Sequence, residues 1–338
     1  LQIALFDAVG KALDVPVRSL LGTTCRDRVP VSWWDIDMPG DDWLAECTTA
    51  IRAGYTSFKT KARPWFDLSR QLEIMAGGVP DWFELDLDFN GLLVNTAHAT
   101  RVIGSIEDRP NVAILETPIP QRDVEGMRRI RRMTHLPVAM HYGSPPFPTV
   151  VTDDLCDGFV VGGGASAVIR SGSAIAEANK ILWLQLVGTG ITVAWSVHLG
   201  AVLSHARWPA VNCHQLFVDS LVRPEMVVAD GTTRVPDAPG LGVELADEVI
   251  DRYRVEPREK PYPHPGLLIA IRQPSGGTVY YTHTRQYSKD YEQGRLRPFP
   301  QGVYLETIPD DGSAEWRDLA RRAASGGVHV AAGNGGAL

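Results

Sequence analysis

Two stretches of the chain decide its fold: YTSFKTK at residues 55–61 and FELDLDFN at residues 83–90. In a β-strand, successive side chains point to opposite faces, so residues two apart share a face. Lys59 and Lys61 therefore point the same way, and in the second stretch the acids alternate with phenylalanine and leucine. An ordinary half-exposed strand turns its polar face to water. Because helix-like segments separate these strands, we instead expect a parallel barrel whose strand ends carry a site.

The alternation of strand and helix continues along the chain. We predict strands at 29–34, 55–61, 82–88, 112–117, 137–141, 158–161, 181–186 and 211–215. We predict helices at 1–13, 42–53, 66–76, 95–105, 123–133, 146–152, 165–179 and 195–205. Eight strands alternating with helices are typical of a (β/α)8 barrel, because doubly wound sheets seldom sustain such regularity.

The pattern changes after Leu216. We predict a small hairpin at 227–235, a helix at 246–253 and a proline-rich boundary at 258–265. Beyond this boundary we predict strands at 267–272 and 278–282, a helix at 315–324 and a loose Gly- and Ala-rich tail at 324–338. These elements indicate a small additional α+β unit.

Composition and charge argue against several classes of function. The net charge is −7, and the arginine cluster at 128–132 has the spacing of a solvated helix face, so we expect no nucleic-acid partner. The four cysteines form no C-x-x-C pair, which indicates neither a zinc site nor a disulfide framework. We find no signal peptide and no apolar run of about 18 residues. We therefore expect a cytoplasmic protein with no membrane partner.

Carboxylates at the ends of two neighbouring predicted strands are the first candidates for chemistry. Asp88 ends one strand and Glu116 the next. Two carboxylates a few ångströms apart repel each other unless a cation lies between them, and oxygen ligands with room for water suit Mg²⁺. A nearby cation and partial burial lower the pKa of a lysine, so Lys61 on the preceding strand is a candidate base. The alternative is that these acids and Lys59 and Lys61 merely neutralise one another.

Several motifs, in this order, resemble the mandelate racemase and muconate lactonizing group of the enolase superfamily. FKTK at 58–61 is similar to its K-x-K motif, LDFN at 87–90 to its D-x-N motif and LETP at 115–118 to its E-x-P motif. PVAM at 137–140 matches the lead-in to the third metal ligand. LLG at 20–22 and VPDAPGLG at 235–242 are similar to the flanking signatures of the group.

The resemblance implies a (β/α)8 TIM-type barrel with a small C-terminal α+β extension. The family precedes its barrel with a capping domain, which we expect upstream of Leu1. The expected organisation is a lead-in helix from the cap at 1–22, the barrel at 23–215, a segment returning to the cap at 216–257 and the extension with its loose tail at 258–338.

The resemblance also implies roles for the candidate residues. Asp88 and Glu116 would be metal ligands with Asn90 beside them, Lys61 would be the base, and Lys59 would tune it. The implied half-reaction is abstraction of the proton α to a carboxylate, with Mg²⁺ stabilising the enediolate.

The chain departs from the family pattern at the third metal ligand. Where the family has Glu, this sequence has Tyr142, preceded by His141. Tyr is a poor ligand for Mg²⁺, and strand alternation sends His141 and Tyr142 to opposite faces unless the strand has already ended. We therefore expect weak metal binding. Gln215 replaces a usual Glu, and the His of a second base is missing from the seventh strand, which disfavours a two-base racemase.

Three functions compete. The first is a lyase resembling an acid-sugar dehydratase, in which Lys61 removes the α-proton and His141 or Tyr142 protonates the leaving hydroxyl. The second is a racemase or cycloisomerase of the same superfamily, and the third is a barrel that has lost catalysis and serves in binding or regulation. The first leads, because dehydration is the commonest such chemistry in the resembling group. We expect a homo-oligomeric enzyme with a small-molecule carboxylate substrate.

Overall fold

The computed structural model describes residues 1–256 and 266–332, which form two compact units. The barrel unit comprises residues 1–36, 44–61 and 78–255. The C-terminal unit comprises residues 37–43, 62–77 and the described residues from 256 onward. The predicted proline-rich boundary at 258–265 and the last six residues of the predicted tail lie outside the described residues.

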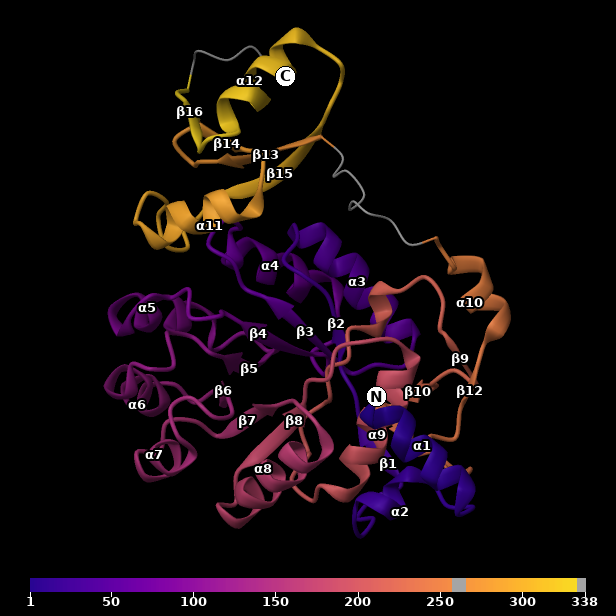
Figure 1. Ribbon diagram of the computed structural model, residues 1–338. Helices are drawn as coiled ribbons and strands as arrows, with labels where there is room; N and C mark the ends of the chain where they lie inside the picture. The colour runs from indigo at the N-terminus through magenta and orange to yellow at the C-terminus, as the bar shows by residue number, and fades with distance from the viewer. Residues whose placement is uncertain (257–265, 333–338) are drawn as a thin grey trace. The chain divides into compact units, whose positions relative to one another are not determined.

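Seven parallel strands form one curved sheet in the barrel unit and follow one another in chain order. They are β2 Trp33–Trp34, β3 Ser57–Lys61, β4 Glu84–Asp88, β5 Val112–Glu116, β6 Val138–His141, β7 Gly158–Val161 and β8 Ile181–Leu184. In Figure 1 the strands lie side by side, with α5 to α8 outside them. Strands β3 to β8 lie within the ranges predicted from the sequence. Apolar and polar side chains alternate along β3 and β4, and β5 to β8 are short apolar runs, as is typical of buried parallel strands.

Residues 210–211 close the barrel between its first and last strands. The Ser32 N–H donates to the Ala210 carbonyl at 2.9 Å, and the Val211 N–H donates to the Leu184 carbonyl at 2.8 Å. These contacts form isolated parallel bridges, which occupy the eighth position of the sheet. The predicted (β/α)8 barrel is therefore confirmed.

The predicted eighth strand at 211–215 is shorter than expected. Cys213 adopts a left-handed backbone with a φ of 54°, and a 3-10 helix, His214–Leu216, follows it. A strand cannot continue through left-handed backbone, because its hydrogen-bonding groups turn away from the ladder. The strand prediction is therefore wrong beyond the first residues of this range.

Two small antiparallel sheets accompany the barrel. One contains β1 Arg28–Pro30, β11 Thr232–Arg234 and β10 Val228–Ala229, and the other contains β9 Val222–Arg223 and β12 Glu244–Leu245. Strands β10 and β11 confirm the predicted hairpin. The single strand predicted at 29–34 is wrong, because β1 leaves the barrel sheet to pair with β11. Pro30, the last residue of β1, has no N–H with which to extend a ladder.

Ten α-helices are described in the sequence before residue 256. They are α1 Gln2–Ala12, α2 Val17–Leu21, α3 Gly40–Arg52, α4 Leu68–Gly78, α5 Thr96–Ile106, α6 Val124–Met133, α7 Phe147–Thr152, α8 Ala165–Glu177, α9 Gly190–Val202 and α10 Asp247–Tyr253. Helix α9 starts earlier than the helix predicted at 195–205. Within the described ranges, we find no helix with the length and apolar character needed to cross a membrane.

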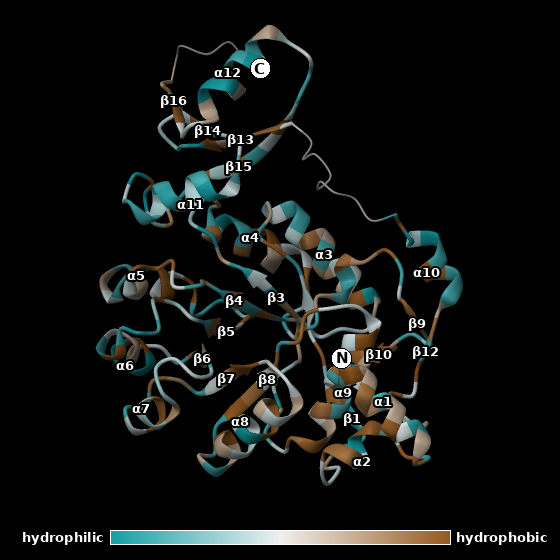
Figure 2. Cartoon of the chain, in the orientation of Figure 1, coloured by the Kyte–Doolittle hydropathy of each residue, from teal (hydrophilic) through white to brown (hydrophobic). Residues whose placement is uncertain are grey.

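Helix α9 is buried along most of its length, which explains why its start was missed. Residues 193–201 are all buried, and Figure 2 shows the helix in brown, the colour of hydrophobic residues. Val193 and Val197 lie four residues apart and pack with Val29 of β1 and with Val235. Because α9 lacks a polar face, the periodicity that marks an amphipathic helix is weak.

The C-terminal unit contains a four-stranded antiparallel sheet in the order β15, β13, β14, β16. Its elements are β13 Leu267–Arg272, β14 Thr278–Tyr281, α11 Thr284–Glu292, β15 Tyr304–Pro309, α12 Ala314–Ala323 and β16 Val328–Val330. Strands β13 and β14 and helix α12 confirm the prediction, while α11 and β15 were not predicted. The predicted loose tail is wrong at 328–330, because β16 pairs with β14.

Residues that follow β2 and β3 in the sequence complete the C-terminal unit. The Trp65 ring lies 4.6 Å from that of Tyr287, and its indole N–H donates to Asp37 at 2.6 Å. The Gly302 N–H donates to the Asp67 carboxylate at 2.6 Å. The unit is therefore discontinuous in sequence. The domain boundaries proposed from the sequence stay predictions.

Candidate active site

Six of the side chains predicted to form a site converge at the ends of β3 to β6. In the parallel register, Lys61 lies opposite Asp88, and Asp88 lies opposite Glu116. Parallel strands present their carboxyl ends at one edge, so neighbouring terminal residues meet there. The convergent residues are Lys59, Lys61, Asp88, Asn90, Glu116 and His141. We call them the charged cluster.

Lys59 is the buried centre of the charged cluster. Its side chain is 0% exposed, forms an ion pair with Glu116 and lies 3.7 Å from the Asp88 carboxylate. Its ammonium also donates to Gln185 at 2.8 Å and lies 5.1 Å from the centre of the Trp183 ring. Burial alone would lower the pKa of Lys59, but the carboxylates of Glu116 and Asp88 raise it further than burial lowers it. Lys59 is therefore held as a cation.

Lys61 is more accessible than Lys59. Its side chain is 14% exposed, forms an ion pair with Asp88 and donates to the Asn90 side-chain oxygen at 3.3 Å. The Asn90 backbone N–H also donates to Asp88, at 2.9 Å. Burial alone would raise the pKa of Asp88, but Lys59 and Lys61 outweigh it and hold the pKa below its ordinary value. Asp88 is therefore ionised at neutral pH.

His141 faces the charged cluster from the end of β6. Its Nε2 atom lies 3.0 Å from a carboxylate oxygen of Glu116, and its side chain is 47% exposed. Glu116 is thus flanked by the buried Lys59 ammonium on one side and by a half-exposed imidazole on the other. An exposed imidazole beside a carboxylate can donate or accept a proton at the surface of the site.

The structure does not bring Tyr142 into the charged cluster. Its ring lies 5.4 Å from that of Phe147 and 5.7 Å from that of Phe159. The Tyr142 N–H donates to the Val160 carbonyl at 3.0 Å, although Tyr142 lies one residue beyond the end of β6. The His141 side chain contacts Glu116, whereas the Tyr142 ring packs with Phe147 and Phe159. The placement of Tyr142 beside the carboxylates is corrected, and its predicted role has no support in this geometry.

Three further residues accompany the charged cluster. Gln185 and Trp183 contact Lys59, as described above, and the alternation of β8 could have shown that they share a face. Asp86, two residues before Asp88 on β4, is buried and has one carboxylate oxygen without a hydrogen bond in the described part of the chain. Burial raises the pKa of Asp86 well above its ordinary value, so this acid is readily held neutral.

The oxygen atoms of the charged cluster fit a weakly bound hard cation. Asp88, Glu116 and Asn90 supply two carboxylates and an amide oxygen, a donor set that Mg²⁺ accepts when water completes its coordination. A cation would have to replace contacts that Lys59 and Lys61 make with the carboxylates. Among the described residues, no group of three or more His, Cys, Asp or Glu is arranged to hold a metal ion.

Comparison with known proteins places the fold in a family. The family described as "Enolase C-terminal domain-like" matches residues 42–249, which is more than half of the chain. The chain belongs to this family, and its resemblance to the mandelate racemase and muconate lactonizing group is confirmed.

Relatives of the chain differ in the reactions that their names state. A D-gluconate dehydratase from Thermoproteus tenax is 25% identical over 293 residues, which cover 77% of this chain and 56% of that protein. A chloromuconate cycloisomerase from Cupriavidus pinatubonensis is 26% identical over 267 residues, which cover 75% of this chain and 71% of that protein. Relatives at this identity do not distinguish one reaction from another.

A solved structure supports the fold. An N-succinyl Arg/Lys racemase from Bacillus cereus superimposes with a TM-score of 0.65 at 20% identity, over 75% of this chain and 70% of that chain. The superposition bears on the barrel architecture alone, because the identity is low.

Proposed function

We propose that the chain is an enzyme that removes the proton α to a carboxylate and then expels a β-hydroxyl, as an acid-sugar dehydratase does. The observation that carries the proposal is the unequal burial of two lysines on one face of β3. Lys59 is 0% exposed and Lys61 is 14% exposed, so Lys61 alone of the two can meet a substrate without a large rearrangement.

Lys61 acts as the neutral amine: its ammonium first gives one proton to water, and Nζ then takes the α-proton of the substrate. The electrons of the Cα–H bond move into the substrate carboxylate to form an enediolate. A bound Mg²⁺ at Asp88 and Glu116 would stabilise this dianion and weaken the hold of Asp88 on Lys61. The Lys59 ammonium stays protonated beside Glu116 and contributes fixed positive charge.

His141 completes the reaction from the exposed side of the charged cluster. As the enediolate collapses, the β-carbon–oxygen bond breaks, and His141 donates a proton so that the oxygen leaves as water. The enol that remains tautomerises to a 2-keto acid. His141 is favoured over Tyr142 for this role, because its imidazole reaches the Glu116 carboxylate and the Tyr142 ring packs on Phe147.

Isotope exchange tests the proposal. The protein is incubated in D2O with Mg²⁺ and a panel of acid sugars, and mass spectrometry follows deuterium at the α- and β-carbons and the loss of water. Loss of water, with deuterium taken up at the β-carbon of the 2-keto acid as its enol tautomerises, supports the dehydratase. Exchange without water loss would instead favour the racemase or cycloisomerase alternative, and binding of an acid sugar without exchange would favour a barrel that only binds.

A further inference from the structure

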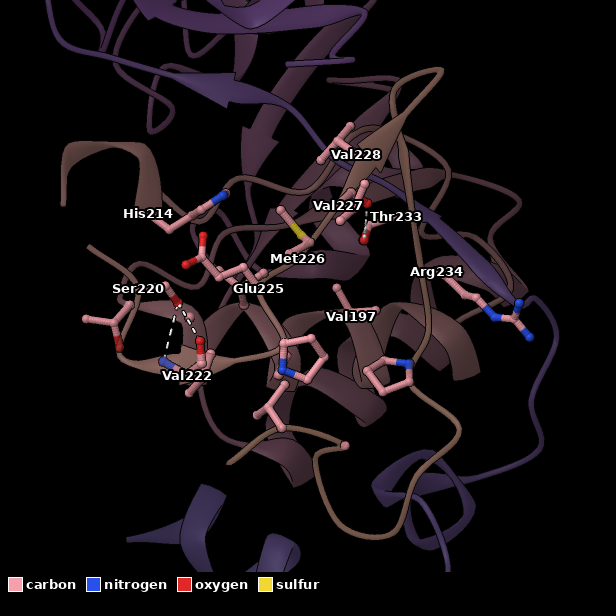
Figure 3. A pocket seen from close by; sticks show the side chains of 18 of the residues that line it. Val197, His214, Ser220, Val222, Glu225, Met226, Val227, Val228, Thr233 and Arg234 are labelled. Atoms are coloured by element: carbon pink, nitrogen blue, oxygen red, sulfur yellow. Dashed lines mark hydrogen bonds between the residues drawn. The ribbon is translucent and has the colours of Figure 1, made fainter. Parts of the chain in front are cut away.

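The barrel unit contains a cavity of about 670 Å³ beside α9. None of the described residues that line it belongs to the charged cluster. Figure 3 shows side chains of α9, of the 3-10 helix and of the β10 and β11 hairpin around it. Cavities of this size are typical of sites for small molecules.

The walls of the cavity are mainly apolar. Val193 and Val197 of α9 line one side, and Met226 and Val235 line another. Met226 is only partly buried, although it packs against the same core as the two valines. These walls favour an apolar ligand, because each methylene removed from water contributes to binding.

Two buried polar atoms at the 3-10 helix lack partners. His214 Nδ1 and Gln215 Oε1 have no hydrogen bond in the described part of the chain, and both residues line the cavity. The other polar atom of each side chain has a partner. His214 Nε2 lies 3.2 Å from the Tyr55 hydroxyl, and the Gln215 amide N–H donates to that hydroxyl at 3.4 Å. A buried polar atom without a partner is costly, so both atoms favour a ligand that can bond them. Because both atoms are closed to solvent, the His214 and Gln215 side chains must turn toward the cavity for a ligand to reach them.

The hydrogen bonds around the Tyr55 hydroxyl decide which ring nitrogen of His214 carries the proton. Because Gln215 donates to the Tyr55 oxygen, the Tyr55 hydroxyl is free to donate to His214 Nε2, which leaves the proton of a neutral imidazole on Nδ1. Burial lowers the pKa of His214 to about 4, so the ring is neutral near pH 7. A ligand hydroxyl could then accept from His214 Nδ1 and donate to Gln215 Oε1.

The charged residues of the lining are already paired. Glu225 lies 2.7 Å from Arg223, and Asp219 lies 3.1 Å from Arg252. Arg234, which also lines the cavity, has an ion pair with Asp237 at 3.1 Å. With their charges partnered, these side chains give little attraction for an ionic ligand, and a neutral ligand is favoured.

We propose that this cavity is a second binding site, for a neutral and mostly apolar small molecule that carries one hydroxyl, with the hydroxyl at His214 and Gln215. The site is independent of the charged cluster and of the reaction proposed there. Its ligand differs in charge from the carboxylate substrate.

The test uses 1-naphthol as the probe and naphthalene as the same ring system without the hydroxyl. Binding to the full chain is followed by ligand-observed NMR and by fluorescence. We expect saturable one-to-one binding of 1-naphthol, at least tenfold tighter than binding of naphthalene. In His214→Phe, this preference should fall to less than threefold.

Cavity filling provides the second arm of the test. Met226→Trp and Val227→Trp should each weaken 1-naphthol binding at least tenfold. Val227 is 77% exposed, so its replacement should leave the fold intact. Leu13→Trp is the matched control, because Leu13 is 60% exposed and outside the lining, and it should bind like the wild type.

Three outcomes would overturn the proposal. The first is absence of saturable binding, and the second is equal binding by Leu13→Trp and both cavity-filled variants. The third is a change of sedimentation coefficient with protein concentration that the cavity-filled variants abolish, because the cavity would then be an interface between copies of the chain.

Discussion

The charged cluster and the cavity beside α9 lie in the same unit but differ in how their polar groups are satisfied. In the charged cluster, Lys59 and Lys61 lie against Asp88 and Glu116, so each charge has an opposite charge beside it. In the cavity, the walls are apolar, and two buried polar atoms at one end have no partner in the described ranges.

Because the cluster is held by paired charges and the cavity is open, substitutions in the cluster should affect stability and substitutions in the cavity should affect binding. Removing one member of a buried ion pair strands its partner, so changes inside the charged cluster should destabilise the fold. Adding bulk to an open cavity strands nothing, so changes there should alter ligand affinity. The exceptions in the cluster are Lys61 and His141, which are partly exposed and should affect the reaction more than the fold.

The largest expected effect is that of Lys61→Met on α-proton exchange. The exchange rate should fall at least about 100-fold, because the proton acceptor is lost while Lys59 remains in place. Lys180→Met is the matched control: Lys180 is 17% exposed and pairs with Asp154 at 2.7 Å, away from the charged cluster. An exchange rate within threefold of the wild type in Lys61→Met would remove Lys61 from its proposed role and direct attention to His141.

Lys59→Met should act mainly on stability. Glu116 would be left buried without its ammonium partner, which should lower the free energy of unfolding by about 3–5 kcal/mol. Urea denaturation followed by circular dichroism measures the loss. In the double variant Lys59→Met/Glu116→Gln, part of the stability should return, because no buried carboxylate at position 116 is then unpaired. If the double variant is as unstable as the single one, the ion pair is not the cause.

Stability should fall on acidification because of two histidines, the buried His198 and the partly buried His214. Burial lowers the pKa of His198 and of His214 to about 4, below the unfolded value near 6.5. Both are therefore neutral in the folded state, and their contribution is fully present above about pH 6.5 and is lost as the pH falls toward 4. Each can contribute up to about 3 kcal/mol of this loss.

The pH effect is measured by urea denaturation between pH 7.5 and pH 4.5. His214→Phe should flatten the decline, because a phenylalanine cannot take up a proton when the chain unfolds. His135→Gln is the control, since His135 is 63% exposed and should leave the decline unchanged. A decline of equal size in His214→Phe would assign the pH dependence to other groups.

The smallest expected effect compares position 141, the last of β6, with position 142, which follows it. His141→Glu should tighten Mg²⁺ binding about tenfold, or by about 1.4 kcal/mol, because the new carboxylate would lie beside Glu116. Tyr142→Glu should not tighten it, because position 142 packs with Phe147 and Phe159. Isothermal titration calorimetry measures both variants. Tighter binding by Tyr142→Glu alone would restore Tyr142 as the equivalent of the third ligand.

The sequence was sufficient for most of the charged cluster. Alternation along β3 and β4 aligned Lys59 with Lys61 and separated Asp88 from its apolar neighbours, and the regular order of strands brought Glu116 beside them. Position 142 was misplaced because the family motif was matched by spacing alone. The direction of the side chain at position 142 depends on where β6 ends, and a motif does not record that the strand ends at His141.

The cavity and the C-terminal unit could not be predicted in the same way. The cavity is lined by segments far apart in the chain, including Trp33, Val197 and Met226, with no common periodicity. In the C-terminal unit, α11 has a strongly polar composition, and its capping box at His283 and Gln286 is more visible in the structure than in the sequence. β15 has a mixed pattern of exposure, so its alternation gives little signal.

The indole of Trp65 has a consequence for how this chain can be cut and recombined. Its partners Tyr287 and Tyr291 come from far along the sequence, yet Trp65 follows the lysines of β3 by only a few positions. The C-terminal unit therefore cannot be exchanged between proteins as one continuous segment of sequence. A gene fragment that stops at residue 256 would expose this aromatic side chain to water, and a graft of the residues from 266 onward alone would lack the Trp65 ring on which Tyr287 packs. Protein engineers who wish to transplant it must carry residues 37–43 and 62–77 with it.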